Sequence, residues 1–233
     1  MLDTTNLLWY SSIAVQFLFC LHLVWTRLVR SFPVFTAVLG YTVARDLAAI
    51  YFMRGAVGAR LPLSYTYFWL WTEPILQLLQ IALAFEVHTK LWKNHRDILR
   101  QTRPLLVFVL LMALTAAAVP VRAEALRHGA SRLVLMMHFG IEARRYISSV
   151  LAIFLVLSAI LYFVVVGNGQ KSSIFRHEGI MAAYFAIYTV TAFLIGAGFL
   201  RAVFVNGYFL SAMTLCFIAW FSAFKPQPWP IEQ

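Results

Sequence analysis

Charged residues are scarce in this 233-residue chain: they make up 12% of the sequence, and only nine are acidic. About a quarter of the residues of a soluble globular domain are charged, so the composition excludes an ordinary water-soluble enzyme. It also excludes a disordered chain, because 62% of the residues are hydrophobic and a disordered segment must keep its side chains in water. The class that remains is an integral membrane protein.

Cysteine is nearly absent, and several cofactor signatures are missing. Cys20 and Cys216 lie inside apolar runs, which indicates small packing residues rather than a disulfide or a metal pair. The last apolar run has no lysine, which argues against retinal, and His-Glu-x-x-His does not occur, which argues against a zinc protease. Haem would need two histidines facing each other at the same depth, and no such pair is found. The sequence also shows no nucleophile with a general base nearby. We therefore expect no catalytic residue, metal or cofactor; a bound lipid is possible and retinal is not expected.

What the sequence has in abundance is apolar runs of membrane-spanning length. About 20 apolar residues cross the hydrocarbon core of a bilayer. Seven runs can be traced, at residues 7–29, 33–53, 65–88, 104–121, 146–166, 179–199 and 204–224. The first has no positive n-region and no cleavage site, so we expect a retained helix. The prediction is an all-α fold, a single transmembrane domain (residues 1–233) forming a polytopic bundle of seven transmembrane helices.

The breaks between runs are also predicted from the sequence. Gly167-Asn168-Gly169 ends the fifth run, and a tight turn around Arg201 and Asn206-Gly207 separates the last two. The proline-rich tail at 225–230 cannot continue a helix.

Basic residues exceed acidic ones by 19 to 9, giving a net charge of +10. Because they lie between apolar runs, they indicate headgroup contacts and topology signals rather than a nucleic-acid surface. The strongest basic stretch follows the third run and is predicted to contact headgroups or a partner protein. It comprises Lys90, Lys93, Arg96, Arg100 and Arg103.

Orientation follows from placing that basic stretch in the cytoplasm, which puts the N-terminus outside in a bacterial inner membrane. The stretch 122–145 disagrees, because its five arginines then lie outside. Part of it, 131–145, is amphipathic enough for either an interfacial helix or a helical extension of the fifth run.

Ionisable residues at bilayer depth are costly and are the best functional clues. Arg45 and Asp46 lie midway along the second run, and Glu73 lies in the third. Arg45 and Glu73 are each about eight residues from the loop that joins these runs, which at about 1.5 Å per residue places them at one depth. We predict an Arg45–Glu73 ion pair. Asp46 points about 100° away on its helix and needs another partner, such as a tyrosine or a water-lined cavity.

Two stripes of polar residues accompany this pair. Glu73, Gln77, Gln80 and His88 recur at helical spacing on the third run, which predicts one face directed into the bundle. Tyr184 and Tyr188 repeat in the same way on the sixth. Together they are candidates for lining a central polar pocket that binds a ligand or relays protons. The alternative is that they are interhelical hydrogen bonds without further function.

Three segments resemble a known group of proteins. These are 32–37 (FPVFTA), 67–73 (YFWLWTE) and 84–88 (AFEVH). They are similar to a group of uncharacterised seven-helix membrane proteins of Acidobacteria-type bacteria, whose members carry an aromatic run with a glutamate and a second glutamate about thirteen residues on, as Glu73 and Glu86 stand here. The layout is distantly similar to the seven-helix input region of bacterial sensor kinases, without a kinase domain. The resemblance implies an architecture and no activity.

Three functions fit these observations. The first is a non-enzymatic sensor or accessory subunit that binds a small ligand or lipid within the bundle and acts through a separate membrane or cytoplasmic protein. The second is a small, oligomeric secondary transporter in which the intramembrane carboxylates relay protons. The third is a lipid-modifying enzyme with Asp46 or Glu73 as acid or base.

Overall fold

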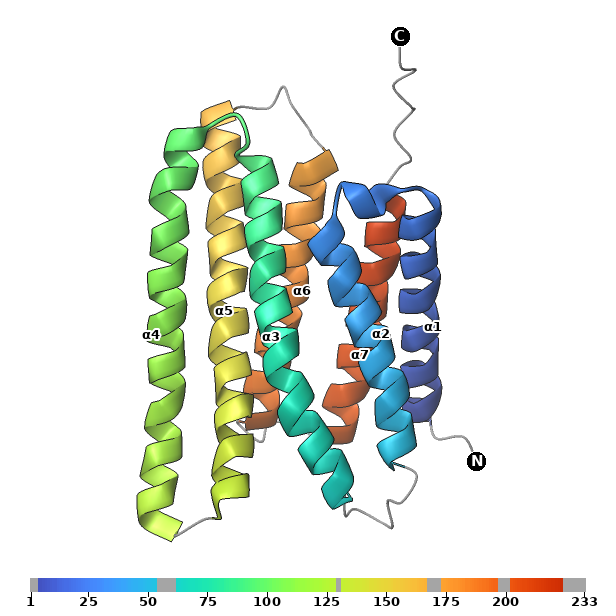
Figure 1. Ribbon diagram of the computed structural model, residues 1–233, viewed down its shortest axis with the longest axis vertical. Coiled ribbons are helices and arrows are strands. Elements are labelled where there is room, and N and C mark those ends of the chain that lie inside the picture. Colours follow the sequence, from blue (N-terminus) through green and yellow to red (C-terminus); the bar gives the residue numbers. More distant parts are fainter. Residues whose placement is uncertain (1–3, 54–61, 129–130, 167–172, 197–201, 224–233) are drawn as a thin grey trace.

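A computed structural model describes residues 4–53, 62–128, 131–166, 173–196 and 202–223. Over these residues the chain forms seven α-helices and one 3₁₀ turn, with no strand (Figure 1). The predicted all-α bundle is confirmed. The elements are α1 (Thr4–Trp25), the 3₁₀ turn η1 (Leu28–Arg30), α2 (Pro33–Met53), α3 (Leu63–Leu91), α4 (Arg96–His128), α5 (Arg132–Val166), α6 (Ser173–Gly196) and α7 (Ala202–Ala223).

Five helices are long and apolar enough to cross a membrane when the described residues are considered. The stretches are Leu7–Trp25, Pro33–Phe52, Leu63–Leu91, Arg96–Ala123 and Arg132–Val166. Large apolar side chains such as Phe17, Leu111 and Val164 stay exposed on their outer faces, where only a nonpolar solvent makes exposure favourable. These are the features of a multi-pass membrane protein.

The helices are longer than the apolar runs that predicted them. α4 begins at Arg96 rather than at residue 104, because arginine, leucine and glutamine are good helix formers outside the apolar core. α5 begins at Arg132 rather than at residue 146, so the segment 131–145 is an extension of the fifth run and not a separate interfacial helix. Asn206 and Gly207 lie within α7, and the turn predicted there is wrong. Gly167-Asn168-Gly169, Arg201 and the tail 225–230 lie outside the described residues.

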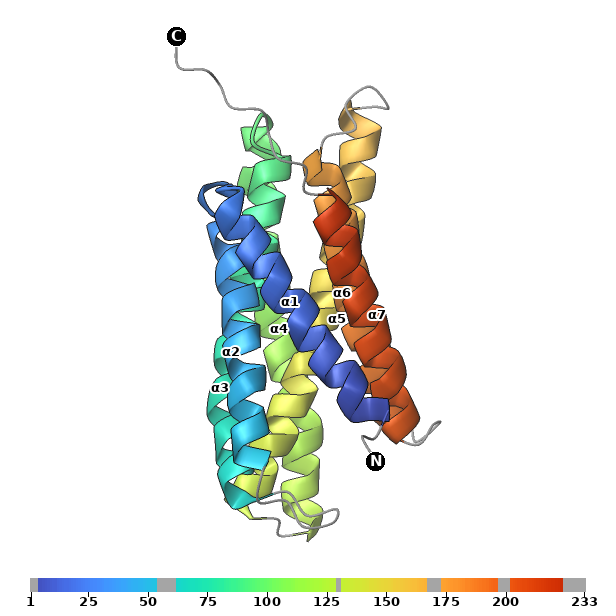
Figure 2. The ribbon, with the colours of Figure 1, turned by 90° about the vertical axis from the view of Figure 1, so that its right-hand side faces the viewer.

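Six of the helices pack as a closed ring in the order α1, α2, α3, α5, α6, α7, with α7 returning to α1. Figure 2 shows α1 in front, between α2 and α7. Helix α4 stands outside this ring at one edge of the bundle and packs against α5 (Figure 1). Buried side chains from all seven helices join in one core, with Phe35, Leu151, Phe185 and Trp220 among the largest.

A carboxylate from α3 caps the start of α2. The backbone N–H of Phe35, in the first turn of α2, donates to Glu86 Oε2 at 3.0 Å. Pro33 begins the helix, as its fixed φ and missing N–H favour. Lys90 Nζ donates to Glu86 Oε1 at 2.9 Å and also to the carbonyl of Ser31. Glu86 thus neutralises the positive end of the α2 dipole and fixes α2 against α3.

Replacing Glu86 should therefore destabilise the bundle. We expect Glu86→Ala to lower the free energy of unfolding by about 1–2 kcal/mol, because a helix cap and a bond to Lys90 are lost together. Glu86→Gln, which keeps an acceptor for the Phe35 N–H, should cost less than half as much. Denaturant unfolding in detergent micelles measures both values. Equal stability of Glu86→Ala and the wild type would contradict this assignment.

Candidate functional site

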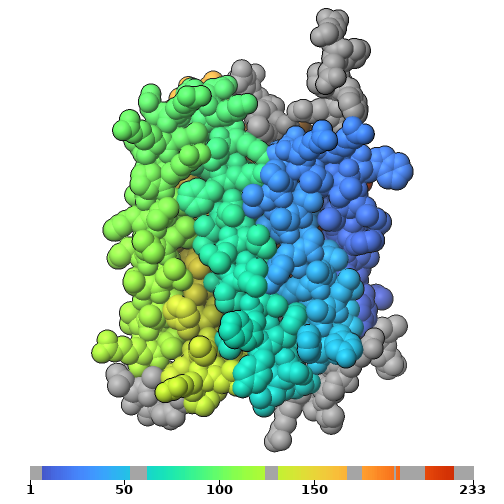
Figure 3. Space-filling view, in the orientation of Figure 1, coloured from blue at the N-terminus to red at the C-terminus, as the bar shows by residue number. Residues whose placement is uncertain are grey.

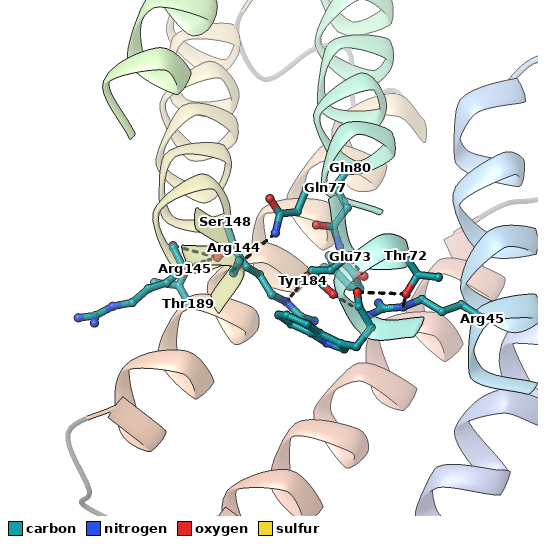
Figure 4. A network of polar contacts seen from close by, with 12 residues as sticks. Arg45, Thr72, Glu73, Gln77, Gln80, Arg144, Arg145, Ser148, Tyr184 and Thr189 are labelled. Carbon is teal, nitrogen blue, oxygen red and sulfur yellow. Dashed lines mark hydrogen bonds and ion pairs between the residues drawn. The ribbon is translucent and has the colours of Figure 1, made fainter. Parts of the chain in front are cut away.

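The predicted ion pair between Arg45 and Glu73 is confirmed. Arg45 Nη2 donates to Glu73 Oε2 at 2.6 Å, and Arg45 Nε donates to Thr72 Oγ1 at 3.1 Å (Figure 4). The Glu73 side chain is 2% exposed and that of Arg45 is 11% exposed. Tyr41 of α2 adds a hydrogen bond of 2.8 Å to the carbonyl of Thr72. Helices α2 and α3 are therefore joined deep in the bundle by charge and by hydrogen bonds.

A second arginine binds the same carboxylate. Arg144 Nε of α5 lies 3.4 Å from Glu73 Oε1, and its guanidinium stacks over the ring of Tyr188 at 4.4 Å. Arg145 points away from this cluster (Figure 4) and pairs with Glu142 at 3.7 Å. Glu73 is thus shared by cations from two helices, α2 and α5.

The role of Arg144 was missed at the sequence level because 122–145 was assigned outside the membrane. A signal was present. The residues before it, at 132–141, read RLVLMMHFGI and are mostly apolar. They place Arg144 inside a long apolar helix rather than in front of one. An arginine there is expected to face the bundle and a partner.

A cavity of about 410 Å³ lies next to this cluster, inside the ring of six helices. Every helix except α4 contributes to its wall. Its polar and charged lining residues are Ser12, Gln16, Thr42, Arg45, Asp46, Tyr65, Arg144, Tyr184 and Tyr188. Its apolar lining includes Trp9, Phe68, Trp69, Phe209 and Phe217. A mostly apolar wall with a few polar groups is the usual form of a small-molecule site.

Asp46 faces this cavity and makes no hydrogen bond or ion pair with any residue that the structure describes. Arg45 and Arg144 are close enough for electrostatic attraction, yet both guanidiniums bind Glu73. Asp46 was predicted to need a partner outside the Arg45–Glu73 pair, such as a tyrosine or a water-lined cavity, and it lies in a cavity wall that also contains Arg45 and Tyr65. A carboxylate is left as an open hydrogen-bond acceptor in the wall of an intramembrane cavity.

The predicted polar stripe of α3 is buried, as expected, but it does not line a single pocket. Gln77 Nε2 donates to the carbonyl of Gly140 at 3.3 Å, and Gln80 Nε2 donates to Tyr184 Oη at 3.4 Å. Glu73 and Gln77 instead face a separate groove on the other side of α3. The central cavity holds Tyr184 and Tyr188 from the predicted set, together with Arg45 and Asp46.

A second buried polar cluster lies at the opposite end of the bundle. His88 Nδ1 is 3.0 Å from Ser158 Oγ, and His88 Nε2 is 2.7 Å from Thr102 Oγ1. Trp92 Nε1 donates to Ser158 Oγ at 2.9 Å, and the fully buried carboxylate of Glu178 lies beside Ser158. No sequence motif predicts this serine–histidine contact, because 70 residues separate the two side chains. With His88 and Ser158 both buried, the cluster joins α3, α4, α5 and α6.

The basic stretch divides into two groups. Lys90 forms an ion pair with Glu86, and its Nζ lies 4.0 Å from the centre of the Phe32 ring. Arg103 Nη2 donates to Thr89 Oγ1 at 2.9 Å. Lys93, Arg96 and Arg100 are exposed at the end of the bundle. Only this second group is free for headgroups or for a partner.

The shared carboxylate makes a specific stability prediction. Arg45→Gln and Arg144→Gln should each cost little, because the remaining arginine still compensates Glu73. The double variant should lose more than the sum, on the order of 3–5 kcal/mol, because an unpaired buried charge remains. A double-mutant cycle from unfolding in detergent measures the coupling, and Arg132→Gln, at an exposed arginine, is the control. Strictly additive losses would contradict the shared pairing.

Comparison with known proteins adds no relative. No family model matches the chain, and neither the curated proteins nor the solved structures contain a similar chain. The site must therefore be interpreted from its own chemistry.

Proposed function

We propose that the protein is a non-enzymatic sensor or accessory subunit of a bacterial inner membrane. It binds a small amphipathic molecule carrying a cationic amine in the central cavity, and acts through a partner protein. The observation that carries this proposal is the carboxylate of Asp46, which faces the cavity without a partner among the described residues. A charge at bilayer depth is costly unless it is paired, and an amine supplies the direct hydrogen-bonding partner that Arg45 and Arg144, both bound to Glu73, do not give Asp46.

The remaining wall suits the rest of such a molecule. Aromatic side chains from α1, α3 and α7 offer apolar surface, with Trp9, Trp69 and Phe217 among them. Arg144 makes one ion pair, to Glu73, whereas a guanidinium has five N–H donors. The cavity thus also accommodates a carboxylate or another acceptor on the same ligand.

The geometry of Glu73 supports binding over proton relay. A relay carboxylate must exchange a proton with a neighbouring group or with water, whereas each oxygen of Glu73 faces a guanidinium, from Arg45 or from Arg144. The transporter alternative rests on Asp46 alone. It predicts flux of the bound molecule across proteoliposomes, which the sensor hypothesis does not.

The charge distribution supports an N-terminus outside. The described basic residues at the end of the bundle opposite the N-terminus are Arg27, Arg30, Lys90, Lys93, Arg96, Arg100, Arg103 and Arg176 (Figure 1). At the other end, Arg144 lies inside the bundle on Glu73 and no longer counts as a loop charge. The excess of positive charge therefore favours the first end as cytoplasmic, and the cavity then opens on the outer side of the membrane. Lys93, Arg96 and Arg100 are left exposed toward a cytoplasmic partner or anionic headgroups.

The binding step is tested with four probes of one shape: phenylalanine, phenethylamine, 3-phenylpropionate and ethylbenzene. We expect thermal stabilisation of the purified protein by the two amines and little by the other two, because only an amine pairs with Asp46. Asp46→Asn should abolish the shift. Asp97→Asn, at an exposed aspartate of α4, is the matched control and should keep it.

The partner is tested by purification from the native membrane in mild detergent, followed by mass spectrometry. A stoichiometric protein that is lost from a Lys93→Ala, Arg96→Ala, Arg100→Ala variant supports an accessory role. A chain that is isolated alone and moves the bound amine across proteoliposomes would overturn it in favour of the transporter. Stabilisation that persists in Asp46→Asn would contradict the binding site itself.

A further inference from the structure

A groove of about 750 Å³ lies outside the ring, between α3, α4 and α5. Its walls are almost wholly apolar, with Leu78 and Ile81 from α3, Leu114 and Ala118 from α4, and Phe139 from α5. In the space-filling view α5 forms its floor, visible in yellow between α4 and α3 (Figure 3). This groove is separate from the central cavity, and the inference drawn from it does not rest on the proposed function.

The groove exists because α3 and α4 diverge. Near the loop that joins them they are held together by His88 to Thr102 and by Arg103 to Thr89. Toward the other end α3 leans away from α4 (Figure 1), and among the described helices α4 packs closely on α5 alone. The result is a wedge that is closed at one end and open at the other, with its mouth on the outer, lipid-facing side of the bundle.

Two charged residues line this wedge: Glu73, whose carboxylate is bound by Arg45 and Arg144, and Arg122, which lies near the open end. Arg122 lies one turn beyond Ala118 on α4, at the end of the apolar stretch Arg96–Ala123. Its side chain is exposed. An arginine at this position extends its guanidinium to the headgroup level while its stem stays against apolar surface. The groove therefore combines a long apolar trough with one cation at the membrane interface.

The dimensions match one leaflet. From Leu70 to Ile81 the groove follows 12 residues of α3, and their 11 steps at a rise of about 1.5 Å each give roughly 16 Å. Half of the roughly 30 Å hydrocarbon core of a bilayer is about 15 Å. A single acyl chain whose headgroup sits at the interface fills that depth.

We propose that this groove binds one acyl chain of an anionic phospholipid, with the phosphate paired to Arg122. The guanidinium fork binds phosphate oxygens in pairs. Charge complementarity favours an anionic headgroup, because its phosphate is not offset by a cationic group as it is in phosphatidylcholine. The apolar walls select the chain. The lipid would fill the gap between α3 and α4 that the protein's own side chains leave open.

The test uses bilayers of phosphatidylcholine containing a brominated phosphatidylglycerol. Trp69 and Trp71 both line the groove, and bromine on the acyl chain quenches nearby indoles. The part of the quenching that is lost in a Trp71→Phe variant comes from the groove, and we call it the groove component. Arg122→Gln should lower the preference for phosphatidylglycerol over phosphatidylcholine about fivefold, the contribution of one basic residue near an anionic surface. Arg132→Gln, at an exposed residue near the same end and not in the groove, should leave it unchanged.

A second pair of variants tests the chain rather than the headgroup. Ala118→Phe places a ring inside the groove and should abolish the groove component of the quenching. Val119→Phe, one residue further on and 68% exposed, should have no effect. An equal loss in Arg122→Gln and Arg132→Gln would show general surface attraction, and unchanged quenching in Ala118→Phe would show that no chain enters. Either result overturns the proposal.

Discussion

The arrangement of the bundle depends on one buried carboxylate that serves two arginines from different helices. Glu73 receives Arg45 from α2 and Arg144 from α5, so α3 is held between its two neighbours in the ring by charge. In a membrane there is little hydrophobic preference for one apolar helix face over another. Specific polar contacts must then decide which faces meet. A charge with two partners fixes the rotation of α3 more tightly than a single pair does.

The consequence is a division of α3 into two sides with different chemistry. On one side Tyr65, Phe68 and Trp69 face the polar cavity inside the ring. On the other, Leu70, Leu78 and Ile81 face the apolar groove beside α4. Because Glu73 is held from both flanks, neither side can rotate into the other's place without separating a buried charge from its partners, which costs several kcal/mol.

The sequence predicted the part of this arrangement that depends on local spacing. Counting residues from the loop between α2 and α3 placed Arg45 and Glu73 at one depth, since a helical hairpin leaves little freedom in register. The buried face of α3 followed from helical periodicity for the same reason. Arg144, Ser158 and Glu178 could not be placed in this way. Arg144 and Ser158 reach partners on α3, which is not adjacent to α5 in sequence, and Glu178 lies beside Ser158 across the connection from α5 to α6. A count along the hairpin of α2 and α3 carries no information about these three residues.

Hydropathy also misplaced the ends of α4 and α5, in α4 because helix formation and membrane burial stop at different residues. Arg96 begins a helix whose first turns are polar, so the apolar run there marks the membrane and not the helix. α5 differs, because the mostly apolar residues 132–141 already belong to its membrane-spanning stretch, and the predicted run at 146–166 began too late. Because the predicted fifth run began at residue 146, Arg144 was assigned to a loop rather than to the helix.

The central cavity and the groove beside α4 are separated by a single side chain, that of Trp69, which packs against a glycine of α5. The indole of Trp69 lines both spaces and packs against Gly140 of α5, where an added Cβ would lie 3.2 Å from the ring. The carbonyl of that glycine accepts from Gln77, one turn beyond Glu73 on α3. A glycine at this contact lets α5 approach closely enough for Arg144 to reach Glu73 while one aromatic ring separates a polar interior from lipid. The contact between Trp69 and Gly140 therefore accounts both for the close approach of α3 and α5 and for the separation of the cavity from the groove.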